Sequence, residues 1–365
     1  MGNSGGKPSA GWLEKGEKGI AMRDITYAVI GCGFMGGVLA RVGSELPYAR
    51  CIAASDIDIE RAKGLAASFG GSPYQDFHEM LHDHHPDAVI IATPEQAHLE
   101  PVLAAARAGC HVFLEKPMAT SLKDADEMVA ACTAAGVKLM IGHILRFEVS
   151  YALIKSAISE GSIGRFLSAY ARRVTSINEA RRLAGRVSPV SYIAVHDIDQ
   201  MLWYHPVAVK SVYAKALRGR VWEELGTYDS AWMMIEFEDG ALGVHEVGWC
   251  LPEEWAKWQR PASWGGFGDV RMNVIGTTGS LNLDFTPMNL FGVDREGWKL
   301  PDTRHWPTMN GKLVGAAKLE VEHFFDCILE NKQPLVTGED GRRSLEVMLA
   351  AEQSIAKGGI VMLPL

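Results

Sequence analysis

Three glycines near the N-terminus constrain the fold of this chain more than any other feature. The apolar segment Asp24–Ile30 leads into Gly31-x-Gly33-x-x-Gly36, and a helix-compatible segment follows over Val38–Glu45. This pattern is typical of a buried strand, a tight turn and a helix N-terminus. Gly31 allows the sharp turn, Gly33 lets a phosphate approach the backbone, and Gly36 allows close helix–strand packing. The sequence therefore predicts a pyrophosphate site at the start of a helix.

A second apolar segment, Cys51–Ser55, ends in an acidic residue, Asp56. At this distance from a glycine turn, a carboxylate accepts hydrogen bonds from an adenosine ribose. Strand, turn, helix and acidic residue together favour a dinucleotide site over an ordinary glycine turn in another α/β protein. Because a carboxylate repels a 2′-phosphate, Asp56 predicts NAD in preference to NADP, although the nearby Arg61 would soften that preference.

The bulk composition excludes several other classes of protein. The chain has 365 residues, enough for two domains, and a net charge of −8 with a pI of about 5.9. A nucleic acid or an anionic membrane surface is therefore not an expected partner, and no apolar stretch reaches membrane-spanning length. The six cysteines are scattered without a CxxC pair, which favours free thiols in a reducing compartment and hence the cytoplasm.

Strand-like and helix-like segments alternate over the first part of the chain. Residues 1–22 are rich in Gly, Lys and Ser without an apolar core, which is typical of a disordered tail. Over residues 23–146 the alternation predicts a Rossmann domain, a doubly wound parallel sheet with helices on both faces. Beyond Asp56, strands are expected at Asp87–Thr93, His111–Leu114 and Val137–Ile141, and helices over Gln96–Ala108 and from Ser121 to Gly136.

The pattern changes after Arg146. One helix, Val149–Glu160, precedes longer strand-like runs, and turns such as Asp239-Gly240 join neighbouring runs as hairpins. Residues 147–365 are therefore predicted to form an α+β domain with a large, mainly antiparallel, open-faced sheet. Its strands are expected at Arg165–Ser176, Ser211–Leu217, Asp229–Glu238, Ala241–Trp249, Val270–Ile275 and Ser280–Phe285, and closing helices at Lys318–Leu329 and Glu339–Ala356.

Four short motifs give the chain a resemblance to a known family. They are the glycine motif, Thr93-Pro94 with His98, Ala108-Gly109-Cys110-His111-Val112 followed by Glu115-Lys116-Pro117, and His196-Asp197-Ile198-Asp199. From about Ile25 to its C-terminus, the chain resembles the Gfo/Idh/MocA oxidoreductases, the glucose–fructose oxidoreductase and inositol dehydrogenase group. The resemblance implies a Rossmann domain and an open-faced second domain whose sheet joins a homodimer or homotetramer. It also implies NAD as cofactor and a carbohydrate or cyclitol substrate.

The resemblance assigns roles to individual residues. The implied cofactor-binding residues are Gly31, Gly33, Phe34, Met35, Gly36, Asp56, Ile57, Thr93, Pro94, Glu95, His98, Glu115 and Lys116. The catalytic candidates are Lys116 and His196, which the resemblance implies, and Tyr192, where the chain departs from the family; the candidate substrate-binding residues are Lys116, His143, Arg172, Tyr192, His196 and Asp199. Many family members carry an aspartate at the position of Tyr192, and a tyrosine would not hold an imidazolium as a carboxylate does.

General chemistry supports two of these assignments. Oxidation of a secondary alcohol requires a hydride acceptor and a base that removes the hydroxyl proton. Lys116 follows a predicted parallel strand, at the edge where open α/β sheets bind ligands, which suits a proton relay at the substrate hydroxyl. Asp199 lies three residues after His196, so on a helix their side chains share a face, and Asp199 would bind a second hydroxyl.

Two arginines and three histidines leave alternatives open. Alternation along the predicted strand turns one of Arg172 and Arg173 toward the pocket. There it would either favour a substrate with a carboxylate or phosphate or form a structural salt bridge. His82, His84 and His85 have a spacing that suits a polar loop better than a metal site, so no metal is predicted.

The predicted activity follows from these motifs together. It is the NAD-dependent oxidation of a ring secondary hydroxyl of a sugar, a sugar derivative or a cyclitol to a ketone. A first alternative is a hydrolase of the same fold that retains NAD and cleaves glycosidic bonds through transient ring oxidation. A second alternative is a non-catalytic ligand sensor, which the presence of both Lys116 and His196 disfavours.

Overall fold

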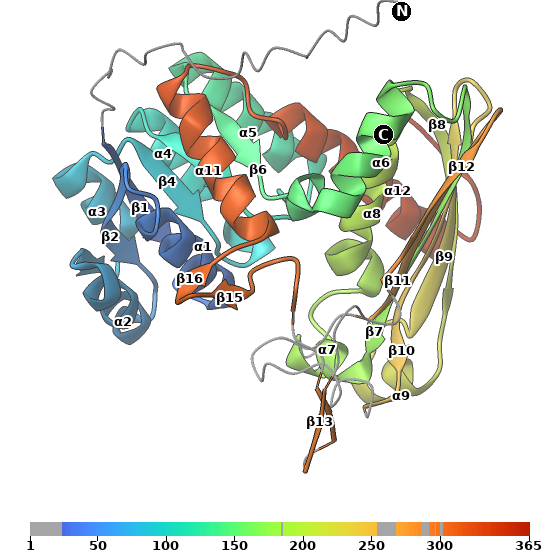
Figure 1. Ribbon diagram of the computed structural model, residues 1–365, viewed down its shortest axis with the longest axis horizontal. Helices are drawn as coiled ribbons and strands as arrows, with labels where there is room; N and C mark the ends of the chain where they lie inside the picture. Colours follow the sequence, from blue (N-terminus) through green and yellow to red (C-terminus); the bar gives the residue numbers. More distant parts are fainter. Residues whose placement is uncertain (1–23, 184, 254–267, 286–291, 296, 300–301) are drawn as a thin grey trace, which may run out of the picture.

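The computed structural model describes residues 24–183, 185–253, 268–285, 292–295, 297–299 and 302–365. Two large sheets organise these residues, with a layer of helices between them (Figure 1). The predicted disordered tail, residues 1–22, lies outside the described residues. A parallel first sheet and a mixed, mainly antiparallel second sheet confirm the predicted α/β fold class.

The first sheet is six-stranded and parallel, in the order β3-β2-β1-β4-β5-β6. Its strands are β1 (Ile25–Ile30), β2 (Ala49–Ser55), β3 (Ser72–Tyr74), β4 (Ala88–Ile91), β5 (His111–Leu114) and β6 (Leu139–Ile141). The apolar strand β4 is buried along its whole length, as expected for a parallel sheet covered on both faces. The strand order reverses between β1 and β4, and open α/β sheets bind ligands at the C-terminal edge beside such a reversal.

Local chemistry sets the ends of the helices that connect these strands. They are α1 (Phe34–Ser44), α2 (Ile59–Phe69), α3 (Phe77–His84), the 3-10 turn η1 (Glu95–Ala97), α4 (Leu99–Arg107) and α5 (Leu122–Ala135). Side-chain oxygens of Asp58, Asp76 and Ser121 accept backbone N–H groups and cap α2, α3 and α5. α2 and α5 end at Gly70 and Gly136 in the left-handed conformation that favours glycine.

The second sheet is seven-stranded, in the order β12-β11-β7-β10-β9-β8-β17. Its strands are β7 (Phe166–Ser176), β8 (Val209–Leu217), β9 (Ser230–Phe237), β10 (Leu242–Leu251), β11 (Asp269–Gly276), β12 (Ser280–Asp284) and β17 (Val361–Met362). β7 and β10 pair in parallel, and the other neighbours pair antiparallel. The hairpin predicted at Asp239-Gly240 is confirmed, because it joins β9 to its antiparallel neighbour β10.

One face of the second sheet is buried and the other is open. Along β9, Met233 and Ile235 are buried, whereas Trp232 and Met234 are 43% and 48% exposed. The helices α6 (Val149–Ser159), α8 (Val195–Tyr204) and α12 (Gly338–Lys357) lie between the two sheets (Figure 1). Strand alternation therefore leaves large apolar side chains in solvent on the open face.

The connections around β8 contain helices that the sequence does not predict. α7 (Ile177–Arg182), the π-helical turn η3 (Val190–Ala194) and α8 lie between β7 and β8, and α9 (Arg220–Leu225) follows β8. α7 and α9 have six residues each, too few for a helical period to stand out. These short elements matter, because α7, η3 and α8 border the site described below.

The C-terminal helices connect the two halves of the chain. α11 (Ala316–Leu329) packs on the first sheet, where Phe325 contacts Tyr27 and Phe324 contacts Phe113. α12 contacts both α5 and β8. The turn η2 (Ile144–Phe147) precedes α6, and the hairpins β13 (Gly292–Asp294) with β14 (Gly297–Lys299) and β15 (Thr308–Met309) with β16 (Lys312–Leu313) precede α11. The domain boundary at residue 146 stays a prediction, and α11 returns across it.

Candidate active site

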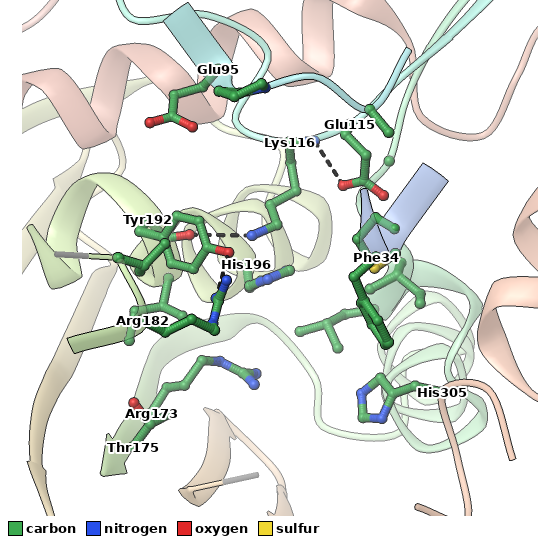
Figure 2. A pocket seen from close by; sticks show the side chains of 18 of the residues that line it. Phe34, Glu95, Glu115, Lys116, Arg173, Thr175, Arg182, Tyr192, His196 and His305 are labelled. Atoms are coloured by element: carbon green, nitrogen blue, oxygen red, sulfur yellow. Dashed lines mark hydrogen bonds between the residues drawn. The ribbon is translucent and has the colours of Figure 1, made fainter. Parts of the chain in front are cut away.

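A cavity of about 280 Å³ lies at the C-terminal edge of the first sheet, between the two halves of the chain. The loops after β1, β4 and β5 form one side, and β7, α7, η3 and α8 form the other (Figure 2). The polar and charged residues that line it are Thr93, Glu95, Glu115, Lys116, Arg173, Thr175, Arg182, Arg186, Tyr192, His196 and His305. The structure thus brings the predicted catalytic residues Lys116, Tyr192 and His196 into one cavity.

The glycine loop beside this cavity is shaped to receive a phosphate. Gly31 has a φ of +93°, and a Cβ there would lie 2.6 Å from the carbonyl carbon of Ala92. A Cβ on Gly36 would lie 2.0 Å from the Gly31 oxygen, so only glycine lets α1 approach β1 this closely. A Cβ on Gly33 would meet open space, and α1 begins at Phe34 without a side-chain cap. The first N–H groups of α1 are therefore available to an anion, which fits the pyrophosphate of a dinucleotide.

Asp56 directly follows β2. Its carboxylate both fixes the neighbouring loops and leaves acceptors for a ribose. Its Oδ2 accepts a hydrogen bond from the Cys32 N–H at 2.8 Å, and its Oδ1 accepts one from the Asp58 N–H at 2.9 Å. These bonds orient the carboxylate beside the glycine loop, and each oxygen keeps a lone pair for a ribose hydroxyl. Arg61, which would soften the preference for NAD, is 3.4 Å from Asp58. The neighbouring Ile57 is 88% exposed.

Lys116 follows β5 and projects into the cavity (Figure 2). Its Nζ donates to the backbone oxygen of Tyr192 at 3.3 Å and lies 4.5 Å from the centre of that ring. Among the described residues, no carboxylate lies within 4.0 Å of the ammonium. Glu115 is 8% exposed and accepts the Lys116 N–H with Oε2 at 3.1 Å. Burial raises the pKa of Glu115 to about 7, against the opposing charge of Lys116.

His196 lies in the first turn of α8, across the cavity from the glycine loop. Burial lowers its pKa well below the ordinary value, and the positive charges of Lys116 and Arg173 lower it further. The imidazole is therefore neutral at physiological pH and able to accept a proton. Its buried Nδ1 has no hydrogen-bond partner within the part of the chain that the structure describes. No carboxylate orients this ring from the position of Tyr192.

Tyr192 lies in η3 and occupies the space between two cations. Its hydroxyl accepts a hydrogen bond from Arg182 Nη2 at 3.1 Å, while its backbone oxygen and its ring both face Lys116 (Figure 2). The phenol thus fixes the relative positions of the two cations, which is a different role from that of an aspartate partner to His196.

Two predicted substrate residues lie outside the cavity wall. Asp199 is 1% exposed and accepts two hydrogen bonds from Arg146, at 2.9 Å from Nε and 2.6 Å from Nη2. His143 is equally buried, with Nε2 3.2 Å from the Ser344 hydroxyl and 4.0 Å from Asp199. Asp199 lies on the same helix as His196, α8, but its carboxylate is occupied by an internal ion pair.

The structure places Arg173, rather than the predicted Arg172, in the cavity. Successive residues of β7 point to opposite faces of the sheet. Arg172 lies on the open face and pairs with Glu246 and Asp269. Arg173 lines the cavity and pairs with the buried Asp197 at 2.6 Å. Alternation alone indicates that one of the two arginines faces inward, and the packing of α8 decides which.

The loop after β4 carries further predicted cofactor residues. Thr93, Pro94 and Glu95 line the cavity. His98 is buried, with its ring nitrogens 2.9 Å from the Thr93 oxygen and 3.2 Å from the Met118 oxygen. Burial lowers the pKa of His98, so its neutral ring donates to one of these two oxygens. His98 therefore holds the loop in place from behind.

Sequence reasoning missed several residues of the wall, among them Arg182, Arg186, His305 and Trp306. The concentration of arginines between residues 181 and 186 is a signal for the first pair. His305 and Trp306 come from the segment before β15, which crosses to the glycine loop. There Trp306 contacts Phe34 edge to face, with ring centres 5.8 Å apart. No local pattern connects residues that are so far apart in sequence.

The histidine-rich stretch forms the end of a helix instead of the predicted polar loop. His82 and His84 lie in the last turn of α3, where His82 is 3.1 Å from Asp83 and His84 is 3.1 Å from the Tyr74 hydroxyl. Within the described ranges, no group of three or more His, Cys, Asp or Glu side chains is placed to hold a metal ion. Among the helices that the structure describes, none is long and apolar enough to cross a bilayer.

Comparison with known proteins places the chain in a family. Residues 25–143 match the oxidoreductase family with an NAD-binding Rossmann fold, and residues 151–282 match the GFO/IDH/MocA C-terminal domain. Fold and site thus define an NAD-binding oxidoreductase. The chain belongs to the Gfo/Idh/MocA oxidoreductase family, which confirms the resemblance drawn from its motifs.

Individual relatives match most of the chain. It is 28% identical to scyllo-inositol 2-dehydrogenase (NAD(+)) of Bacillus subtilis (strain 168), over 93% of this chain and 96% of that protein. It is 30% identical to 2,7-anhydro-N-acetylneuraminate hydratase of Escherichia coli (strain K12), over 71% and 70%. The structure of scyllo-inositol dehydrogenase from Lactobacillus casei with bound NAD(H) and scyllo-inositol superposes with a TM-score of 0.80 at 22% identity, over 93% and 99%. The last comparison shows the shared fold.

Proposed function

We propose that this protein oxidises a ring secondary hydroxyl of a sugar, a sugar derivative or a cyclitol to a ketone, with NAD as hydride acceptor. One observation carries the proposal: the Lys116 ammonium and the His196 imidazole face the same cavity beside the glycine loop (Figure 2). The names of the inositol dehydrogenase relatives support a polyol substrate.

The residues of the first half fit the cofactor. Gly31, Gly33 and Gly36 would receive the pyrophosphate, and Asp56 the adenosine ribose. When bound, NAD supplies the acceptor for the hydride that leaves the alcohol carbon. We propose NAD over NADP because Asp56 would repel a 2′-phosphate. Dissociation constants of both dinucleotides, measured by calorimetry, test this preference, and tighter binding of NADP would contradict it.

The proton chemistry belongs to the protein. The neutral His196 imidazole would accept the hydroxyl proton as the carbon–oxygen double bond forms. Lys116, held by the Tyr192 backbone oxygen, would donate a hydrogen bond to the same substrate oxygen and stabilise its developing negative charge. Lys116 and His196 therefore act together on the hydroxyl, His196 as the base and Lys116 as the hydrogen-bond donor to the oxygen, and Tyr192 positions the ammonium.

Two substitutions test these roles. Lys116→Ala and His196→Ala should each lower kcat about 10²- to 10⁴-fold, the range for loss of a positioned acid or base. NAD affinity should survive both changes, because neither side chain holds the pyrophosphate or the adenosine ribose. Turnover is read from the absorbance of reduced nicotinamide with a panel of cyclitols, aldoses and glycosides. Near-normal kcat in both variants would remove the proposed roles.

A redox-neutral reaction is the second candidate. A relative named as a hydratase favours it, and so does the hydrolase alternative, in which a retained NAD oxidises the ring only transiently. Net formation of NADH separates the candidates. A dehydrogenase accumulates NADH in step with ketone, whereas a retained cofactor yields product, such as released aglycone, without net reduction.

We also propose that the open face of the second sheet joins a homodimer or homotetramer. Tyr213, Trp232 and Met234 on neighbouring strands are between 43% and 48% exposed, which is unusual for a sheet facing only water. Light scattering of wild type and Trp232→Glu tests this, because a buried charge would dissociate the assembly. The six cysteines are free thiols, which supports the proposal of a cytoplasmic protein.

A further inference from the structure

The wall opposite the glycine loop contains a guanidinium with an unused donor. Arg173 donates from Nε and Nη2 to Asp197, at 2.6 and 3.0 Å, and from Nη2 to the Tyr151 hydroxyl at 2.9 Å. Its Nη1 has no hydrogen bond to any residue that the structure describes. Figure 2 shows this guanidinium pointing into the cavity below His196. Asp197 is fully buried, so the arginine is held from behind and its free edge faces the cavity.

A second guanidinium on the same side repeats this arrangement. Arg182 donates from Nε and Nη2 to Glu179, at 3.1 and 2.7 Å, and from Nη2 to the Tyr192 hydroxyl. Its Nη1 likewise has no partner within the described part of the chain. Figure 2 shows the group beside Tyr192, on the same side of the cavity as Arg173. The Thr175 hydroxyl, two residues after Arg173 on β7, lies in the same wall without a hydrogen-bond partner in the described ranges.

The charges around the cavity leave an excess of positive charge. Arg173, Arg182 and Arg186 each pair with one carboxylate, from Asp197, Glu179 and Glu95 respectively. The ammonium of Lys116 has no such partner among the described residues. Of the cavity carboxyls, Glu115 is partly protonated at neutral pH because it is buried. A neutral polyol can accept hydrogen bonds from the free N–H groups but leaves the excess charge uncompensated, whereas an anion accepts from the same groups and also compensates the charge.

We propose that this site binds an acidic sugar or cyclitol, whose carboxylate accepts hydrogen bonds from Arg173 Nη1 and Arg182 Nη1 while a ring hydroxyl reaches Lys116 and His196. The inference rests on the proposed function and narrows its substrate class. Arg182 is the specificity-determining residue. It contacts the carboxylate, whereas Lys116 and His196 contact the reacting carbon's hydroxyl.

The test compares matched substrates of one ring configuration. Each set contains a hexose, the corresponding hexuronate, the methyl ester of that uronate, and the hexose 6-phosphate. Initial rates with NAD should give the uronate a kcat/KM about tenfold or more above its ester in at least one configuration, because the ester keeps the ring and the carbonyl oxygen but lacks the negative charge. Raising the ionic strength should raise KM for the uronate and leave the ester unchanged.

Variants assign the effect to one residue. Arg182→Met should lower kcat/KM for the uronate about 10- to 100-fold more than kcat/KM for the ester, and the difference should appear in KM. Arg181→Met is the matched control, because Arg181 neighbours Arg182 on α7 but pairs with Glu224 and Glu253 outside the cavity. It should leave both substrates unchanged. Calorimetric affinity of the uronate for the NADH complex should fall by the same factor in Arg182→Met, which reports binding without turnover.

Four results separate the possibilities. The inference is supported if wild type prefers the uronate over its ester and Arg182→Met loses that preference. If the hexose and the ester have a kcat/KM equal to or above that of the uronate in every configuration, the inference is overturned but the proposed dehydrogenase function stands. An Arg182-dependent preference for the phosphate over the uronate overturns the assignment of a carboxylate. If NAD binds but no hexose, uronate, ester, phosphate or cyclitol reduces it, the proposed function and this inference both fall.

Discussion

Two buried Arg–Asp ion pairs hold the helix α8. They differ in whether the arginine has N–H donors that remain free to bind a ligand. Asp197 and Asp199 are 0% and 1% exposed, and each accepts two hydrogen bonds from one guanidinium. Arg146 spends its remaining donors internally, on the Leu335 oxygen at 3.0 Å and near Asp340 at 3.4 Å. Arg173 uses Nε and Nη2 in this way and has no partner for Nη1 among the described residues, and its guanidinium points into the cavity (Figure 2).

This difference shows how an ion pair can serve either structure or ligand binding. A pair whose N–H donors are all used internally is structural, whereas a pair with a free donor at a cavity can also bind a ligand. The Arg146–Asp199 pair has its donors and acceptors occupied within the protein, so it could contact a substrate only if the ion pair broke. The pair on the second sheet is braced by Tyr151 at 2.9 Å and by His245, 3.2 Å from Asp197, and still presents an N–H to the cavity. Substitutions in the two pairs should therefore separate stability from substrate binding.

The largest effect on stability is expected for Asp199→Asn. Loss of this carboxylate leaves the Arg146 charge buried with only a longer contact to Asp340, and breaking a buried ion pair costs about 3–5 kcal/mol. Urea unfolding measures the free energy of unfolding, and protein that remains folded should keep its KM. A raised KM at unchanged stability would instead support the substrate role predicted from sequence.

A smaller loss of stability with a clear kinetic effect is expected for Asp197→Asn. Arg173 borders the cavity, so its uncompensated charge can be hydrated, and the cost should be about 1–3 kcal/mol. KM should rise about tenfold because the guanidinium is no longer held in place.

The pH dependence of this variant sharpens the comparison. Burial alone would raise the pKa of Asp197, but Arg173 and His245 outweigh it and lower the pKa from 3.8 to about 2. The folded carboxyl thus binds its proton less readily than the unfolded one. Its contribution to stability is present above pH 3.8 and is lost as the pH falls toward 2. The gap between wild type and Asp197→Asn should narrow over that range in acid unfolding curves, and a constant gap would contradict it.

A moderate effect is expected on the pH profile of catalysis. The pKa of His196 lies well below 6.5 because of burial and the charges of Lys116 and Arg173. A lowered pKa means that the imidazole stays neutral, and competent as a base, as the pH falls below 6.5. The acidic limb of kcat/KM that His196→Asn removes should therefore lie below pH 6.5. An acidic limb above pH 6.5 that disappears in this variant would break the assignment.

The smallest effect is expected for Arg172→Met, the neighbour of Arg173 on the open face. Its partners Glu246 and Asp269 lie with it on the face of the sheet away from the cavity, so the substitution should not reach the substrate. The kcat/KM of every substrate should stay at the wild-type value in steady-state assays. A loss comparable to that of the Arg173 pair would mean that the open face takes part in the site.

Local sequence determined the first sheet and its ligand edge. The glycines, Asp56 and Lys116 lie next to strand ends, and the period of the strands and the caps of the helices are encoded within short windows. The sequence predicts β5 at its observed bounds and the alternation of buried and exposed residues along β9, because both depend only on near neighbours.

Tertiary structure alone decided the second half of the site. Alternation indicates that Arg172 and Arg173 face opposite sides, but the side that α8 covers selects Arg173. Asp199 shares a helical face with His196, yet Arg146 reaches it from η2, fifty-three residues earlier in the chain, and withdraws it from the cavity. Trp306 meets Phe34 only because the segment before β15 crosses back to the glycine loop. Packing between residues far apart in sequence determines which arginine N–H donors remain free to bind a ligand. A local sequence pattern cannot predict this.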